Sequence, residues 1–340
     1  MLDNRLAALM PVRFNALVIE TTNRCNAKCA MCYQSSGPKG HDQWGKHSMD
    51  RERLVRIIEE APRIPNLDSR LHIAGGEAFL NANDVYALVE AGRRAGFADI
   101  TLTTNAFWGV SAERALSVCE RLSDAGVTGL EISWDFWHLE YIQPECVSRV
   151  LGAAQSVNIS TNLRILTTKR HSVHEAIDLL GDGVLHATII THGPVFRSGR
   201  AVSQIDPDEF YRKGVTPADN CHAALNLALN STGDAFPCCA GIDQTKGLGL
   251  GNAKDESIVD IARRMSQNLW IKKLVFGGVL SVERIVTEGR GDAPAIDEED
   301  SMCSRCWSLF SDEQNVAVVK KYSENLEHRL AREIEARMGA

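Results

Sequence analysis

The sequence predicts an α/β protein in which a partial (β/α)6 barrel is followed by a smaller region of different construction. Between residues 14 and 195, six short β-rich runs alternate with amphipathic stretches. This alternation is typical of parallel strands joined by helical crossovers. A closed barrel of this kind needs about eight such units, and the alternation stops near residue 200. We therefore expect an incomplete barrel over residues 1–200 and a second domain over residues 201–340.

Each unit of the barrel is predicted from its own stretch of sequence. Ser111 and Asn83 are expected to be helix N-caps, and Gly96 and Gly126 lie where helices should end. The strands are predicted at Asn15–Glu20, Arg70–Ala74, Asp99–Thr104, Gly129–Asp135, Ser160–Leu166 and Leu185–His192. The helices are predicted at Met49–Glu60, Asp84–Ala95, Ala112–Asp124, Glu145–Ala154 and Ser172–Leu180.

The second region contains fewer regular elements. Leu225–Asn230 and Ala235–Cys238 are expected to form a hairpin, and a helix should cover Glu256–Asn268. Thr287–Ser301 is rich in Gly, Asp and Glu, which predicts a loop. An amphipathic helix is expected over Asp312–Met338.

Composition narrows the class of protein. The net charge is −7, from 37 basic and 44 acidic side chains, which argues against a nucleic-acid partner. No apolar run is long enough for a signal peptide or a membrane span. We therefore expect a cytoplasmic protein with no membrane partner. In that reducing compartment the ten cysteines are expected to include metal ligands rather than disulfides.

Three of these cysteines are clustered directly after the first predicted strand. Cys25, Cys29 and Cys32 lie within eight residues, and thiolates are ligands for iron–sulfur clusters or zinc. Three thiolates on a four-iron cluster leave one iron without a protein ligand. A structural zinc site would need a fourth ligand, for which His41 and His47 are candidates. A zinc-stabilised binding module therefore stays open as an alternative.

The C-x3-C-x2-C pattern, followed directly by Tyr33, resembles the signature of the radical SAM superfamily. In that superfamily the cysteine loop follows the first strand of a partial (β/α)6 barrel. The resemblance implies that the open iron of a [4Fe–4S] cluster binds the amino and carboxylate groups of S-adenosylmethionine. An electron from a donor such as flavodoxin or ferredoxin then breaks the C5′–S bond. The resulting 5′-deoxyadenosyl radical removes a hydrogen atom from the substrate.

Further residues match the cofactor site of the same superfamily. The run Gly75-Gly76-Glu77 after the second predicted strand resembles the Gly-Gly-Glu-Pro motif that holds the methionine amino group. Ala78 replaces the proline. The resemblance also implies cofactor contacts from residues on the third, fourth and fifth strands, namely Asn105, Ser133 and Arg164.

A second set of cysteines follows the barrel. Their order resembles that of the auxiliary-cluster domains called SPASM and twitch, including a Gly-x4-Cys element that ends at Cys238 and a following Gly251-Asn252. Because no cysteine follows Cys306, the resemblance implies one auxiliary [4Fe–4S] cluster of the twitch type, with zinc as the alternative. The implied ligands are Cys221, Cys238, Cys303 and Cys306.

Three residues are candidates for catalysis on the substrate. Asp135 and His138 follow the fourth strand among aromatic residues, where they are placed to orient substrate or accept a proton. The alternative is an aromatic seam with solvated charges. Cys239 is a spare thiol beside Cys238 and a candidate hydrogen-atom donor, as in radical epimerases. Packing in the core is the alternative for Cys239.

The sequence therefore predicts a radical SAM oxidoreductase or maturase. A peptide is the favoured substrate, and oxidation or epimerisation of a small sugar or aminocyclitol is the alternative. Few residues precede the first strand, so a leader-recognition domain is not expected at this end. Substrate identity, the bond altered and the oligomeric state are left open by the sequence.

Overall fold

The computed structural model describes residues 12–216, 219, 221, 225–238, 250–292, 294, 296–297 and 300–338. Within this part of the chain one sheet runs in the order β6-β5-β4-β3-β2-β1-β7-β8. The strands β1 to β7 pair in parallel, and β8 pairs antiparallel with β7. The bounds of the first six strands are β1 Ala16–Glu20, β2 Arg70–Ala74, β3 Asp99–Thr104, β4 Gly129–Ser133, β5 Ser160–Thr167 and β6 Ile189–Pro194.

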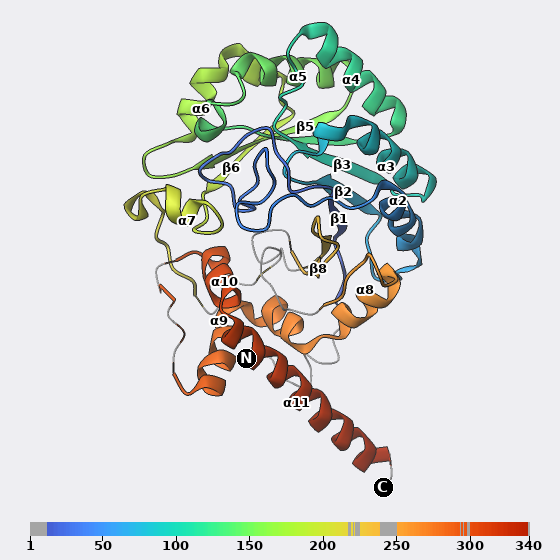
Figure 1. Ribbon diagram of the computed structural model, residues 1–340, viewed down its shortest axis with the longest axis vertical. Coiled ribbons are helices and arrows are strands. Elements are labelled where there is room, and N and C mark those ends of the chain that lie inside the picture. The colour runs from blue at the N-terminus through green and yellow to red at the C-terminus, as the bar shows by residue number, and fades with distance from the viewer. Residues whose placement is uncertain are drawn as a thin grey trace.

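The six strands β1 to β6 with intervening helices confirm the predicted partial barrel. Its sheet is not closed, because β6 and β8 are the two ends of the strand order in the described residues. The helices α2 to α6 lie outside the curved sheet (Figure 1). They cover α2 Arg51–Glu60, α3 Ala82–Arg94, α4 Ala112–Ala125, α5 Pro144–Ser156 and α6 Val173–Leu180.

The sheet has one apolar and one polar face. On β2, Leu71 and Ile73 are buried toward the helices, whereas His72 alternates with them. The same period of two places Glu131 of β4 and Asn162 of β5 opposite their buried neighbours. The apolar core therefore lies between sheet and helices, and the concave side of the barrel is polar.

Local signals set the ends of several helices as predicted. Ser111 accepts a hydrogen bond from the Arg114 amide at the start of α4, and Gly126 ends that helix in the left-handed region. Asn83 is not an N-cap, which corrects the prediction. A 3-10 turn over Ala78–Asn81 leads directly into α3, so Asn81 precedes the helix and Asn83 lies inside its first turn.

Two of the six barrel strands differ from the prediction by more than one residue at an end. The strand β4 ends at Ser133, because Asp135 uses its side chain to cap a 3-10 turn over Phe136–His138. The strand β6 begins at Ile189 rather than Leu185, because the preceding residues Gly181–His186 form another 3-10 turn.

The region after residue 200 extends the same sheet. The predicted hairpin is present as β7 Asn226–Leu229 and β8 Ala235–Phe236, and β7 pairs in parallel with β1. This region also contains α7 Ala201–Gln204, α8 Ile258–Gln267, α9 Leu269–Arg290, α10 Met302–Ser311 and α11 Glu313–Met338. In Figure 1 the helices α9 to α11 lie below the barrel, and α11 extends away from the body.

The helix α9 is the largest element that the sequence analysis missed. The predicted loop over Thr287–Ser301 is wrong at its start, because Thr287–Arg290 are the last residues of α9 and Gly291, with a positive φ of 84°, ends the helix. The apolar run of α9 is interrupted at Gly278, which has a non-helical backbone and kinks the helix. This interruption hides the helical period of the sequence.

Candidate active site

A cavity of about 310 Å³ opens at the carboxyl ends of the barrel strands. Cys25, Cys29 and Cys32 line it, between β1 and α2. Of the other predicted site residues, those that line the same cavity are Gly75, Gly76, Glu77, Asn105, Ser133, His138 and Arg164. The fold therefore brings together residues from five consecutive strand ends, which is where barrel enzymes place their active sites.

The three thiols belong to one loop, which we call the cysteine loop (Cys25–Ser36). The amide of Ala27 donates to Cys25 Sγ at 3.4 Å, and the Asn105 amide group lies 3.7 Å from the same sulfur. Burial raises the pKa of Cys25 and of Cys32 above that of an ordinary thiol. Deprotonation of each of these two buried thiols therefore costs free energy unless a positive group lies nearby.

This arrangement fits a [4Fe–4S] cluster. Three thiolates are the donor set that such a cluster uses, and all three sulfur-bearing residues lie on one cavity wall. Among the described residues, no three His, Cys, Asp or Glu side chains converge closely enough for a single metal ion. Beside them, the buried hydroxyl of Ser36 has no hydrogen-bond partner in the described chain, as expected where a further group belongs.

The glycine pair supports the cysteine loop through close backbone packing. A Cβ on Gly75 would lie 2.8 Å from the carbonyl oxygen of Thr22, and one on Gly76 would lie 2.3 Å from that of Arg24. The amides of Gly76 and Glu77 donate to these two carbonyls at 2.6 and 2.8 Å. Larger residues would therefore push β2 away from the residues that precede Cys25.

The carboxylate of Glu77 is buried at the cavity wall. It accepts hydrogen bonds from the backbone amide of Phe79, the hydroxyl of Thr104 and the backbone amide of Asn105, at 3.0, 3.0 and 2.8 Å. Burial raises its pKa to about 7, although these donors oppose the rise. A carboxylate has about four acceptor sites, so these three donors from the described residues leave one acceptor site of Glu77 unused.

The guanidinium of Arg164 lines the cavity and has no hydrogen-bond or ion-pair partner among the described residues. Gly193 of the adjacent β6 makes room for it, because a Cβ there would lie 2.8 Å from Arg164 Nη2. A guanidinium without a protein acceptor is suited to a carboxylate of a ligand. Ser133 lies beside it, paired with Arg164 in the sheet register.

Of the two candidate residues that follow β4, His138 lines the cavity and Asp135 does not. Asp135 is fully buried and is not a cavity-lining residue. Its carboxylate lies 2.9 Å from His138 Nδ1 and accepts from the Leu166 amide at 3.3 Å. His138 lines the cavity; burial alone would lower its pKa, but the sulfur of Cys29 and the Asp135 carboxylate raise it well above the ordinary value. Asp135 thus holds the histidine that faces the cysteine loop.

Sequence reasoning missed a polar ladder across the concave face of the sheet. The ring nitrogens of His72 hydrogen-bond with the hydroxyls of Thr101 and Thr103 at 2.8 and 2.9 Å. Glu131 is 3.4 Å from Thr103 Oγ1 and 3.4 Å from Asn162 Nδ2. The signal was present as polar residues at every second position of the predicted strands.

Two of the four predicted auxiliary ligands share one helix. Cys303 and Cys306 lie on α10, and the charge of Cys221 acts on both. Burial raises the pKa of Cys303 to about 12 and that of Cys306 in the same direction. We call Cys221, Cys303 and Cys306 the C-terminal cysteine group. Cys238 is buried after β8, and Cys239 lies outside the described residues.

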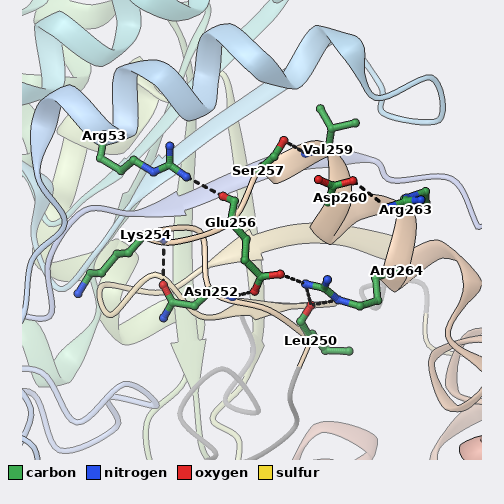
Figure 2. A network of polar contacts seen from close by, with 10 residues as sticks. All are labelled: Arg53, Leu250, Asn252, Lys254, Glu256, Ser257, Val259, Asp260, Arg263 and Arg264. Carbon is green, nitrogen blue, oxygen red and sulfur yellow. Dashed lines mark hydrogen bonds and ion pairs between the residues drawn. The ribbon is translucent and has the colours of Figure 1, made fainter.

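The Gly251-Asn252 element ties the hairpin to the barrel. Asn252 donates to Thr232 O at 3.1 Å and to Asp234 Oδ1 at 2.8 Å. Arg53 of α2 donates to the carbonyl oxygens of Ala253 and Glu256, both at 2.6 Å. Figure 2 shows Arg53 reaching from the helix toward this turn. The C-terminal region is therefore attached to the barrel here as well as at the pairing of β1 with β7.

Comparison with known proteins gives relatives along most of the chain. The putative peptide biosynthesis protein YydG of Bacillus subtilis is 24% identical over 314 residues, which cover 90% of this chain and 95% of the relative. The probable GTP 3′,8-cyclase of Methanocaldococcus jannaschii is 29% identical over 135 residues, 40% of this chain and 39% of the relative.

Two solved structures share the fold. Streptococcus suis SuiB bound to precursor peptide SuiA matches with a TM-score of 0.55 at 16% identity, over 76% of this chain and 66% of that one. The structure of anSMEcpe with bound AdoMet matches with a TM-score of 0.55 at 15% identity. The match covers 92% of this chain and 99% of that one. Residues 19–182 match the radical SAM superfamily, a family that implies a [4Fe–4S] cluster and S-adenosylmethionine. The chain is therefore an enzyme that carries a radical SAM domain over residues 19–182.

Proposed function

We propose that this enzyme modifies a peptide, as in the maturation of ribosomally made natural products. The observation that carries the proposal is the similarity to the peptide biosynthesis protein YydG along nearly the full length of both chains. The fold shared with SuiB, which was solved with a precursor peptide, agrees with it. The relatives described as GTP cyclases cover less than half of this chain.

In this proposal the cysteine loop supplies Cys25, Cys29 and Cys32 as ligands of the [4Fe–4S] cluster. When bound, the cluster supplies an electron that splits S-adenosylmethionine and starts radical chemistry on the substrate. Glu77 accepts a hydrogen bond from the ammonium of the cofactor, and Arg164 binds its carboxylate through two parallel N–H donors.

The remaining cavity residues orient the cofactor and the substrate. Asn105 and Ser133 are proposed to contact the ribose, because their side chains lie at the ends of β3 and β4 in the cavity wall. His138, held by Asp135, is proposed to donate a hydrogen bond toward Cys29 rather than to act on the substrate as a base. The role of Cys239 as a hydrogen-atom donor stays a prediction.

We further propose that Cys221, Cys238, Cys303 and Cys306 hold an auxiliary [4Fe–4S] cluster in a second domain that begins near residue 201. The burial of Cys306 and the raised pKa of both Cys303 and Cys306 support this, since buried thiolates need a compensating positive group. A flavodoxin or ferredoxin is the proposed electron donor. In the described chain no helix is both long and apolar enough to cross a membrane.

The test is anaerobic reconstitution with iron and sulfide, followed by dithionite, S-adenosylmethionine and the short peptides encoded beside the gene. We expect 5′-deoxyadenosine to form and one peptide to change in mass, configuration or retention on a chiral or reversed-phase column. Cofactor cleavage without change of any such peptide, together with conversion of an aminocyclitol, would refute the peptide assignment. Equal cleavage by the wild type and by Cys29→Ala would refute the ligand assignment.

A further inference from the structure

We propose that Arg200 is a positioning residue of the cysteine loop and sets the reduction potential of the cluster bound there. Arg200 follows β6 in the chain and is far from the loop in sequence, and its side chain is only 5% exposed. The inference rests on the proposed ligation by Cys25, Cys29 and Cys32, and it assigns a role to a residue that no motif marks.

The guanidinium of Arg200 uses all three of its nitrogens on the loop and its flank. Nη1 donates to the carbonyl oxygen of Cys29 at 2.8 Å, and Nη2 donates to that of Ser36 at 2.7 Å. Nε donates to Asp42 Oδ2 at 2.8 Å. The backbone amide of Arg200 donates to the carbonyl oxygen of Cys32 at 3.0 Å. One residue therefore fixes the backbone at two of the three proposed ligands and at the end of the loop.

The approach of this segment to the loop depends on Gly199. Its φ is 55°, in the left-handed region, and a Cβ there would lie 2.0 Å from the carbonyl oxygen of Tyr33. A side chain at position 199 would therefore separate Arg200 from the loop. The local sequence Gly199-Arg200 is thus suited to close contact between the segment after β6 and the cysteine loop.

The charge of Arg200 is also relevant. Its partner Asp42 is shared with Lys28, whose Nζ lies 3.3 Å from Asp42 Oδ1. Two cations and one carboxylate leave a net positive charge, and the guanidinium is the buried member of the three. Buried charges are poorly screened, and a positive charge near a cluster stabilises its more negative, reduced form. Removal of this charge should therefore make the cluster harder to reduce.

Arg53 offers a matched control for this chemistry. It also donates to two backbone carbonyls, those of Ala253 and Glu256, and it joins α2 to the C-terminal region (Figure 2). Its contacts are with that region and not with the cysteine loop. Substitution of Arg53 removes the same kind of bridge and should lower stability without a change in the cluster potential.

The experiment compares Arg200→Gln, Arg200→Lys, Arg53→Gln and Arg53→Lys after anaerobic reconstitution. Circular dichroism gives the folded fraction and melting temperature, and iron analysis gives loading. Potentiometric titration followed by electron paramagnetic resonance gives the midpoint potential of the cluster whose signal responds to S-adenosylmethionine. None of these measurements requires a peptide substrate.

We expect Arg200→Gln to load less iron and to shift the midpoint potential to a more negative value. Arg200→Lys should restore much of the potential, because it keeps the charge, but not the loading, because an ammonium cannot span three acceptors. Both Arg53 variants should keep the wild-type potential and loading at a lower melting temperature. If Arg200→Gln does not fold, Asp42→Asn should shift loading in the same direction, since it removes the acceptor that orients Arg200 Nε.

Arg200→Gln with wild-type loading and potential and only a lower melting temperature, like Arg53→Gln, would overturn the inference. So would wild-type loading in Asp42→Asn where Arg200→Gln cannot be folded. Absence of iron from the wild type would instead refute the proposed ligation, so the two failures are distinguishable.

Discussion

The cysteine loop and the C-terminal cysteine group lie in different surroundings. The first lies at the open end of a sheet with a polar concave face, and its three residues line a cavity. The second lies on and beside α10, where Cys306 is buried next to the ion pair between Arg305 and Glu283. The first group is reached through the cavity, whereas in the second group Cys306 is buried and Cys221 and Cys303 are partly exposed. We therefore expect cofactor chemistry at the first group and a supporting role for the second.

The largest expected effect separates the two sites by removal of one thiol from each. Cys29→Ala should abolish S-adenosylmethionine cleavage and lose the iron of one cluster, about four of about eight irons per chain. Cys306→Ala should keep cofactor cleavage but lose the modified product. In both variants, iron analysis measures the clusters that remain, and chromatography of 5′-deoxyadenosine measures cofactor cleavage.

A matched control for these two variants is Cys119→Ala. Cys119 is buried in α4 against the apolar core, so this variant should lose stability but keep both clusters. Zinc in place of iron at Cys306, or complete loss of cofactor cleavage in Cys306→Ala, would contradict the proposed division of roles.

A smaller effect is expected from substitution of Arg164, whose guanidinium lines the cavity of the first site. Arg164→Gln should weaken binding of S-adenosylmethionine by about 10- to 100-fold, since a charge-assisted hydrogen bond contributes about 1.5–3 kcal/mol. Arg264→Lys in the C-terminal region is the control, because Arg264 bonds Glu256 and Leu250 O, away from the cavity. Equilibrium dialysis of the reconstituted variants measures the dissociation constant of S-adenosylmethionine for each. Equal affinity of the two variants for S-adenosylmethionine would argue against the role of Arg164.

The pH dependence of stability should differ between wild type and Glu77→Gln. Because burial raises the pKa of Glu77 to about 7, the metal-free wild type should lose stability as the pH rises from about 4.5 to about 7. The loss is about 3 kcal/mol, from 1.36 kcal/mol per pKa unit over the interval from about 4.5 to about 7. Glu77→Gln should lack this decline. Urea unfolding of both metal-free proteins at pH 5 and pH 8 tests it, and parallel curves would contradict it.

The smallest effect concerns the connection between the two sites. The Arg197 amide donates to Ser304 Oγ at 2.8 Å, so the segment after β6 contacts α10 at one end and the cysteine loop at the other. Ser304→Ala should lower the free energy of unfolding by about 1 kcal/mol. Ser311→Ala, at the exposed end of the same helix, should change it little. Denaturant unfolding of the two variants makes the comparison, and a similar loss in both would count against the contact.

Local sequence signals were sufficient for most of the barrel. Strands such as Arg70–Ala74 carry their own period of two, and helix ends such as Gly126 carry their own cap. The pairing of β7 with β1 was not predictable, because it joins segments about 200 residues apart. The helix α9 was missed because Gly278 interrupts its period.

The candidate site was predictable only where a motif marks it. The cysteine and glycine motifs gave Cys25, Glu77 and their neighbours in the cavity wall. Arg200 carries no such mark, since a single arginine after a strand is ordinary in sequence. Its position depends on the path of the chain back to the loop, which only the folded structure supplies.

The edge strand β6 has a consequence for the handling of this protein in solution. Its Ile189 and Ile190 are 53% and 40% exposed, and β6 is the last strand of the described sheet on that side. Exposed apolar edges favour strand-to-strand association between molecules. Pro194, which lacks an amide hydrogen, limits such a ladder at one end. Concentrated preparations should therefore tend to self-associate along this edge, and a lysine at position 190 should improve their solubility.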